Sequence, residues 1–354
     1  MAQVSGIKGM LLEEIILFLL EHSGYSCIKL KQDSSGEEHD DSNMITRGHS
    51  GMELRGRGAK HQIDAIVDFD FTIPFSYPIR LLVEAKCYNA KVGIDVIRNA
   101  FGVLSDVNEG WTLDEYKKLY KKRYHYQYAV ASTSGFSSEA INYAYVHDIF
   151  LFDLSSSVAF KPIRDILDNL KASDFPTERL ADKDFQKQLR KSFHNCLFNG
   201  WDPQSIIQVL GREEIISYMK IDEIYGSCRT IKERSYLGVI GKTYPVLLFV
   251  TDENREYENN VNNDESVQIY WQNNIWYIKR GDRCLYAFSL PKQLLDLYAE
   301  NGFLSSSSAL NLKETEMDTI QVFMKNPDNN TIKCDYLRLD KNWLEAMKKR
   351  LNHN

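Results

Sequence analysis

Hydrophobic residues recur with helix and strand periods along the first half of the chain. In residues 7–22 the apolar positions recur every three or four residues, which predicts an amphipathic helix. Residues 25–31 are typical of a short strand, and residues 63–71 alternate apolar and polar side chains with the period of a strand. Residues 33–50 are polar and rich in Ser, Gly and Asp, so we expect a surface loop there.

The next segments predict a hairpin and further strands of the same sheet. Pro74 and Pro78 mark a connection, so residues 79–87 form the second strand of the hairpin. Further helices are expected at residues 94–107 and 137–146, and further strands at residues 126–132 and 149–154. Ser137 is a candidate helix cap. This order of elements favours an α/β fold in which helices flank a mixed sheet.

The pattern changes in the second half of the chain. Residues 161–204 are helical and polar, and from residue 205 short strands alternate with turn signals such as Asn273-Asn274. Five strands are predicted at residues 236–240, 246–251, 267–271, 275–280 and 284–289, with helices at 292–300 and 341–351. We therefore expect a domain over residues 1–160, a helical linker over 161–204 and a smaller α+β domain over 205–354.

Composition excludes several classes of protein. The chain has 354 residues, 43% hydrophobic and 26% charged, which is typical of a globular protein. A net charge of −6 excludes coating of nucleic acid by bulk charge, although it does not exclude a nuclease. Six cysteines without a CxxC pair argue against a zinc ribbon or a disulfide framework and favour a reducing cytoplasm. The apolar run at residues 10–20 contains two glutamates, so we expect no membrane span.

The candidate chemistry lies between residues 51 and 86. Glu84 and Lys86 are two positions apart on one predicted strand, so both side chains leave the same face. Asp64 lies on the partner strand, where pairing can bring it beside Glu84. Two carboxylates and an ammonium suit phosphodiester hydrolysis, because Mg²⁺ takes oxygen ligands and a lysine can orient the attacking water. A structural salt bridge between Glu84 and Lys86 is the alternative interpretation.

These residues resemble a known family. The run from Gly51 to Asp64, followed by Val83-Glu-Ala-Lys86 and by Ser132-Thr-Ser-Gly-Phe-Ser137, is similar to the PD-(D/E)xK nuclease superfamily and its Mrr-like restriction endonuclease branch. The resemblance covers residues 5–155 and implies a restriction-endonuclease-like fold. One departure is that Ile63-Asp64 stands where the motif has proline and aspartate.

The resemblance implies roles for individual residues. Asp64 and Glu84 would bind Mg²⁺, for which Mn²⁺ can substitute, and Lys86 would be the catalytic lysine. A glutamate of the first helix is expected near the metal. Glu13 or Glu14 would fit, and Glu14 is the candidate, with a solvated surface position as its alternative. Gln62 precedes Ile63-Asp64, as is common in the family, and is a further candidate at the site.

Two basic segments are candidates for contact with DNA. Arg55, Arg57 and Lys60 flank three closely spaced glycines, which would let the backbone approach phosphates. The alternative is a flexible loop whose arginines only solvate it. Residues 116–126 interleave basic and aromatic side chains and either follow a sugar-phosphate backbone or form an exposed helix face. His61 is expected to be an ordinary hydrogen-bonded residue.

These features together predict a cytoplasmic, metal-dependent endonuclease of restriction or anti-phage defence that acts on double-stranded DNA. A homodimer is expected, because two strands need two active sites. One alternative is a nuclease subunit that is active only when a partner protein or a nucleotide signal engages the second domain. The other is a catalytically inactive DNA-binding module. The aromatic residues around Trp271 and Trp276 suit either cross-strand packing or a nucleotide platform.

Overall fold

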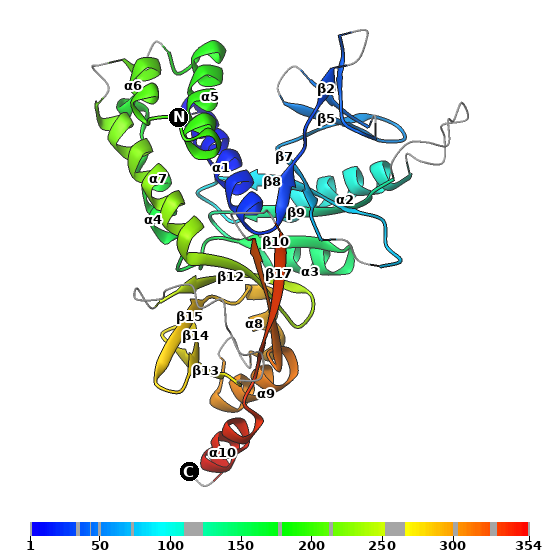
Figure 1. The fold of residues 1–354 in the computed structure, drawn as a ribbon, viewed down its shortest axis with the longest axis vertical. Coiled ribbons are helices and arrows are strands. Elements are labelled where there is room, and N and C mark those ends of the chain that lie inside the picture. Colours follow the sequence, from blue (N-terminus) through cyan, green and yellow to red (C-terminus); the bar gives the residue numbers. More distant parts are fainter. Residues whose placement is uncertain are drawn as a thin grey trace. The chain divides into compact units, whose positions relative to one another are not determined.

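The chain forms two compact units of mixed α/β structure (Figure 1). The computed structural model describes residues 2–32, 36–42, 44–48, 51–71, 74–109, 123–175, 179–211, 215–251, 266–299, 304–325 and 331–352. The first unit comprises Met1–Leu154 and Pro162–Cys228, and the second comprises Ser155–Lys161 and Arg229–Asn354. The predicted α/β class with a second domain is thus confirmed.

The main sheet of the first unit has five strands in the order β1-β7-β8-β9-β10. Its strands are β1 (Tyr25–Cys27), β7 (Ala65–Phe69), β8 (Ile79–Lys86), β9 (His125–Ser132) and β10 (Ile149–Asp153). Strands β1, β7 and β8 pair antiparallel, whereas β8, β9 and β10 pair parallel. The sheet is therefore mixed, as the order of predicted elements indicated.

Helices cover this sheet. Helix α1 (Ala2–His22) packs against β1, β7 and β8, while α2 (Ile94–Glu109) and α3 (Ser138–Val146) pack against each other and against β10 (Figure 1). The predicted cap of α3 is confirmed, because the Ser137 hydroxyl accepts a hydrogen bond of 3.2 Å from the backbone N–H of Ala140.

A second, smaller sheet precedes the site. Its short antiparallel strands are β2 (Lys31–Gln32), β3 (Glu38–His39), β4 (Ile45–Arg47), β5 (Met52–Arg55) and β6 (Lys60–Ile63). The surface loop predicted over residues 33–50 is therefore wrong in part, since β3 and β4 lie there and Ile45 is fully buried. The single strand predicted over residues 63–71 is confirmed as β7 at Ala65–Phe69, but its start is wrong, because Ile63 ends β6 and the chain changes sheets at Asp64.

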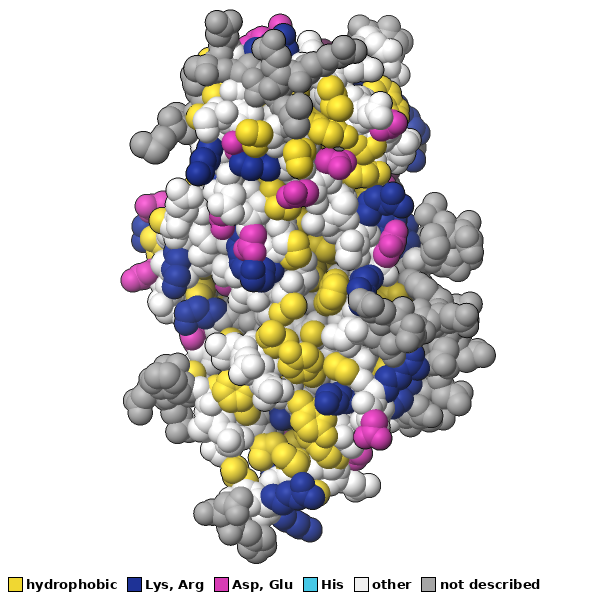
Figure 2. Space-filling model, turned by 90° about the vertical axis from the view of Figure 1, so that its left-hand side faces the viewer, with side chains coloured by type: hydrophobic (Ala, Val, Ile, Leu, Met, Phe, Trp, Pro, Cys, Tyr) yellow, Lys and Arg dark blue, Asp and Glu magenta, His cyan; other side chains and the backbone are white. Residues whose placement is uncertain are grey.

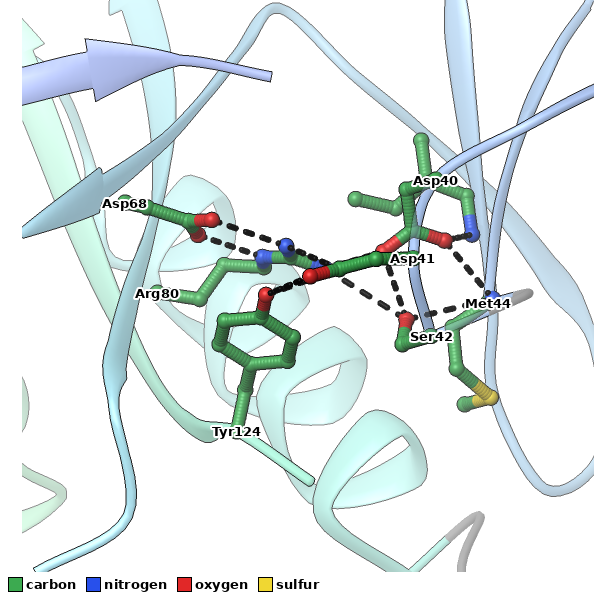
Figure 3. Close-up of polar contacts among 8 residues, drawn as sticks. Asp40, Asp41, Ser42, Met44, Asp68, Arg80 and Tyr124 are labelled. Carbon is green, nitrogen blue, oxygen red and sulfur yellow. Dashed lines mark hydrogen bonds and ion pairs between the residues drawn. The ribbon is translucent and has the colours of Figure 1, made fainter. Parts of the chain in front are cut away.

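A buried polar cluster joins the turn after β3 to the main sheet (Figure 3). The guanidinium of Arg80 on β8 is 1% exposed and bonds Asp68 through Nε (2.7 Å) and Asp40 through Nη1 (2.6 Å). It also lies 3.5 Å from the centre of the Tyr124 ring, whose hydroxyl donates to Asp41. These contacts explain why a polar, acidic segment is ordered, since a buried arginine needs such partners.

From Pro162 onward, the segment predicted as a helical linker belongs to the first unit. It contains α4 (Lys161–Asn169), α5 (Lys183–Asn199) and α6 (Gln204–Leu210), and α7 (Ile215–Arg234) follows it. Helix α5 packs against α1 through buried side chains such as Leu189 and Phe193. This apolar face makes α5 part of a core rather than a spacer. None of the helices among the described residues has both the length and the apolar character of a membrane span.

The second unit is built on a seven-stranded antiparallel sheet in the order β13-β14-β15-β12-β11-β16-β17. The strands are β11 (Ser235–Ile240), β12 (Tyr244–Val250), β13 (Gln268–Gln272), β14 (Ile275–Arg280), β15 (Arg283–Phe288), β16 (Thr319–Lys325) and β17 (Ile332–Arg338). Its helices are α8 (Lys292–Tyr298), α9 (Ser306–Glu316) and α10 (Lys341–Asn352). The β16–β17 hairpin and α9 were not predicted. The Asn273-Asn274 turn is confirmed, with positive φ at both residues.

Candidate active site

Asp64 occupies the single position between β6 and β7, where the chain leaves the small sheet and enters the main sheet. Ala65 pairs with Val83 in the β7–β8 ladder, so one further step of the register puts Asp64 opposite Glu84. The Oδ2 atom of Asp64 accepts a hydrogen bond of 3.0 Å from the backbone N–H of Ala85. The geometry therefore brings Asp64 to the end of β8, as the hairpin predicted.

Glu84 and Lys86 form a direct ion pair at the end of β8. The Nζ atom of Lys86 lies 2.5 Å from Oε1 of Glu84, and both side chains are about one-fifth exposed. Ala85 between them is buried, as strand alternation requires. The pair fits the salt-bridge interpretation. However, Asp64 brings a second carboxyl group to the same place, which a simple salt bridge does not require. The carboxyl groups of Asp64 and Glu84 and the ammonium group of Lys86 thus all lie at the end of β8.

Tyr128 on β9 holds the other oxygen of Glu84. Its hydroxyl donates a hydrogen bond of 2.7 Å to Oε2 of Glu84, and the residue is 1% exposed. Burial and the charge of Glu84 raise the pKa of Tyr128 far above its ordinary value, so the phenol keeps its proton. Sequence reasoning missed this residue, because a tyrosine in a buried strand carries no local sign of its partner.

Burial and neighbouring charges shift the pKa of Asp64 and of Lys86. Burial raises the pKa of Asp64, and the charge of Glu84 raises it further, against opposing contributions from the Ala85 N–H and from Lys86 and Arg190. For Lys86, burial opposes the charged form, but the hydrogen bond and charge of Glu84 raise its pKa overall. Lys86 is therefore protonated at neutral pH, while burial disfavours the charged form of Asp64. A bound cation would offset this effect of burial.

Helix α1 adds two further carboxylates, both bound by α5. Arg190 contacts Glu13 at 2.9 Å through Nη1 and Glu14 at 2.6 Å through Nε. The Nδ1 atom of His194 lies 2.7 Å from the second oxygen of Glu14. Glu14 is 3% exposed, so the surface position considered from the sequence is excluded. The basic side chains of α5 are 176 and 180 residues away from Glu14 along the chain and could not be matched with it from the sequence.

Glu13 and Glu14 differ in their electrostatic surroundings. For Glu14 burial raises the pKa, but the hydrogen bond from His194 and the charge of Arg190 lower it overall. Burial raises the pKa of Glu13 to about 7, with Arg190 opposing and the charges of Asp64 and Glu14 adding to the shift. Glu13 therefore senses the charge of Asp64, whereas both oxygens of Glu14 are engaged by α5. The metal-ligand role of Glu14 stays a prediction.

The donor set at the hairpin fits a divalent cation of the Mg²⁺ type. Such ions are held by one or two carboxylates, with water and substrate oxygens completing the octahedron. Asp64 and Glu84 supply two carboxylates, and a bound cation would favour the charged form of Asp64 against the burial that raises its pKa. Among the described residues there is no group of three or more His, Cys, Asp or Glu side chains that could hold a metal ion by itself. Mg²⁺ binding would thus depend on this pair.

The glycine-rich loop between β5 and β6 is bound by an acid that sequence analysis missed. Asp106 on α2 accepts hydrogen bonds from the backbone N–H groups of Gly58 (2.7 Å) and Ala59 (3.3 Å). Its Oδ2 atom also lies 2.7 Å from Nε2 of His61, which agrees with the expected ordinary role of that histidine. Gly56 is close to the same carboxylate. The loop backbone, which was expected to approach a phosphate, thus donates its N–H groups at Gly58 and Ala59 to Asp106.

The three cations predicted to contact DNA phosphates lie around this loop. Arg57 pairs with Glu109 at 2.9 Å, and Lys60 lies 3.9 Å from Glu53. Arg55, at the end of β5, is exposed. The structure thus gives Arg57 and Lys60 acidic neighbours, and phosphate contact by these residues stays a prediction.

The remaining candidates divide between the two units. Gln62 is exposed on β6 and lies beside Gly51, so its role at the site stays a prediction. Most of the basic segment at residues 116–126 lies outside the described residues. In the second unit Trp271 and Trp276 pair across the β13–β14 hairpin with ring centres 6.0 Å apart, and Trp276 is 1% exposed. These two rings have the predicted cross-strand packing.

Comparisons with known proteins do not identify the chain. No protein-family model and no curated protein sequence matches it. The crystal structure of AF1548, a protein of unknown function, aligns with 63% of this chain and 98% of its own. The sequence identity is 16% and the TM-score is 0.30. A similarity this weak supports no conclusion about function.

Proposed function

We propose that the chain is a Mg²⁺-dependent deoxyribonuclease, an endonuclease that hydrolyses phosphodiester bonds in double-stranded DNA. One observation carries this proposal. Asp64, Glu84 and Lys86 meet at the end of the β7–β8 hairpin, where Asp64 bonds the backbone of Ala85 and Lys86 contacts Glu84. The proposed setting is cytoplasmic restriction or anti-phage defence.

The residues at the hairpin have distinct roles in this proposal. A Mg²⁺ ion, or Mn²⁺ in its place, held by Asp64 and Glu84 would supply a water of lowered pKa and would stabilise charge on the phosphoryl oxygens. Lys86 is charged and donates to the attacking water or to a phosphate oxygen. Tyr128 holds one oxygen of Glu84, and the Ala85 N–H holds one oxygen of Asp64. These two hydrogen bonds fix the orientation of the carboxylates. Such fixed donors need little reorganisation during the reaction.

Binding of DNA would depend on local contacts rather than on bulk charge. The chain carries a net charge of −6, and on the face shown in Figure 2 the basic side chains are interspersed with acidic and apolar ones. We therefore expect affinity for DNA to fall with salt according to the few phosphates contacted. A homodimer would supply two active sites for the two strands.

Cleavage of a supercoiled plasmid tests the proposal. Purified protein with Mg²⁺ or Mn²⁺ should nick or cut the plasmid, and EDTA should stop the reaction. Lys86→Ala should lower the rate by about 10²–10³-fold, as loss of a transition-state donor does. Lys91→Ala is the matched control, because Lys91 is exposed and close in sequence. If Lys86→Ala cuts as fast as the unmodified protein, the assigned centre is wrong.

The same assay separates the alternatives. Cleavage only after addition of cell lysate or nucleotides would favour a nuclease subunit that waits for a partner or signal at the second unit. DNA binding without cleavage under any of these conditions would favour an inactive DNA-binding module. Gel filtration with and without DNA tests the proposed homodimer, and a mass of one chain in both cases would exclude it.

A further inference from the structure

An exposed tyrosine lies beside the lysine of the proposed active site. Tyr88 follows the last residue of β8 by two positions and is 49% exposed. Its ring centre lies 5.9 Å from the Nζ atom of Lys86, which in turn contacts Glu84. None of the described residues forms a hydrogen bond with the Tyr88 hydroxyl group. The exposed part of this ring can therefore meet a ligand that is bound at Lys86.

The backbone that carries this tyrosine is fixed by residues 132–137, a serine-rich segment that has no assigned role. The backbone N–H of Thr133 donates a hydrogen bond of 3.2 Å to the carbonyl of Lys86, just before the tyrosine. Just after it, the Ser134 hydroxyl donates a hydrogen bond of 2.6 Å to the carbonyl of Ala90. The loop after β8 is thus held on both sides of the aromatic ring, and a side chain on a fixed loop loses little entropy when it binds a ligand.

The chemistry next to Lys86 suits the uncharged part of a nucleotide. In the proposed function Lys86 donates to the attacking water or to a phosphate oxygen, so a ring 5.9 Å from its ammonium lies within reach of the adjoining nucleoside. An aromatic ring offers a flat apolar face, and stacking on it tolerates any base. The segment also adds no negative charge that would repel DNA, because no acidic residue lies between Lys86 and Asp95.

We infer that Tyr88 packs its ring against the nucleoside that adjoins the cut phosphate, and that residues 132–137 position the ring. This inference rests on the proposed function and extends it to the uncharged part of the substrate. Tyr88 binds DNA in this role and takes no part in hydrolysis. Loss of the ring should therefore weaken DNA binding without changing its salt dependence, because no phosphate contact is lost.

DNA binding measured without cleavage tests this inference. Fluorescence anisotropy of a short labelled duplex, with Ca²⁺ in place of Mg²⁺, gives the dissociation constant at several salt concentrations. Tyr88→Ala should weaken binding by about tenfold at each salt concentration, as loss of an aromatic contact with a base does. Tyr88→Phe keeps the ring and should bind within about twofold of the unmodified protein. Tyr145→Ala is the matched control, because it removes a similarly exposed ring from α3, and its affinity should not change.

A separate variant tests the positioning by residues 132–137. Ser134→Ala removes the hydrogen bond to Ala90 and should weaken binding by about threefold. Combined with Tyr88→Ala it should cause no further loss, because the hydrogen bond acts through a ring that is no longer present. Additive losses in the double variant would refute the positioning role.

Each outcome decides the inference. Unchanged affinity of Tyr88→Ala, an equal loss in Tyr88→Phe, a smaller salt slope, or no DNA binding by the unmodified protein would overturn it. Circular dichroism shows whether the variants fold. If Tyr88→Ala does not, Tyr88→Leu is measured instead and should weaken binding at least about threefold, because it lacks the flat face. Since the test measures binding, it can fail while plasmid cleavage and its dependence on Lys86 stand.

Discussion

Lys313 on α9 is a buried cation without an acidic partner among the described residues. The residue is 6% exposed, and its Nζ atom lies 5.3 Å from the ring centre of Trp343 and 5.8 Å from that of Trp276. Burial lowers the pKa of Lys313 from 10.5 to about 8. Replacing it by Met keeps a side chain of similar length and removes the charge, so we expect Lys313→Met to stabilise the second unit at neutral pH.

The size of this stabilisation follows from the pKa shift of Lys313, and its pH dependence follows from the sign of that shift. Between pH 8 and pH 10.5 the unfolded chain holds a proton that the folded chain has lost, so stability rises with pH across this window. A shift from 10.5 to about 8 corresponds to about 3 kcal/mol. The two tryptophan rings oppose this by about 0.5–1 kcal/mol each, because they stabilise the ammonium. The net gain of Lys313→Met should therefore be about 1–2 kcal/mol at pH 7 and should vanish near pH 10.5.

Urea denaturation at pH 7 and at pH 10.5 measures this difference directly. Lys341→Met, at the exposed start of α10, is the control and should change the free energy of unfolding by less than about 0.5 kcal/mol. A Lys313→Met protein that is less stable than the unmodified protein at pH 7 would refute the reasoning. It would mean that the tryptophan faces stabilise the charge by more than its burial costs.

Three further substitutions test contacts of the first unit. Arg80→Met should lower the free energy of unfolding by about 3–5 kcal/mol, since it leaves Asp40 buried without its cation, and a urea-derived loss below about 1 kcal/mol would contradict this. In Gly56→Ala the new Cβ would lie 1.9 Å from Oδ2 of Asp106 and displace it, so thermal denaturation should show a loss of about 1–3 kcal/mol, and an unchanged melting temperature would disagree. Tyr128→Phe should slow plasmid cleavage by about tenfold, through a less fixed carboxylate, while stability falls by no more than about 1.5 kcal/mol. An unchanged rate would argue against the positioning role of Tyr128.

Local patterns in the sequence predicted those features that depend on neighbours along the chain. The alternation over residues 63–71, the prolines that follow it and the strand at residues 79–87 predicted the β7–β8 hairpin. The hairpin in turn predicted that Asp64 meets Glu84. Ser137 predicted the start of α3 for the same reason, since a cap bonds a residue three positions away. These contacts follow from the periods of strand and helix.

Tertiary structure decided what surrounds those residues. Tyr128 reaches Glu84 across 44 residues, and Arg190 reaches Glu14 across 176. The buried carboxylate of Asp40 is paired with a guanidinium from β8, 40 residues away along the chain. Such contacts join side chains that share no period along the chain, so nothing in the sequence pairs a given acid with its base. The hairpin was therefore determined locally, whereas the partners that fix and charge its carboxylates were determined by packing.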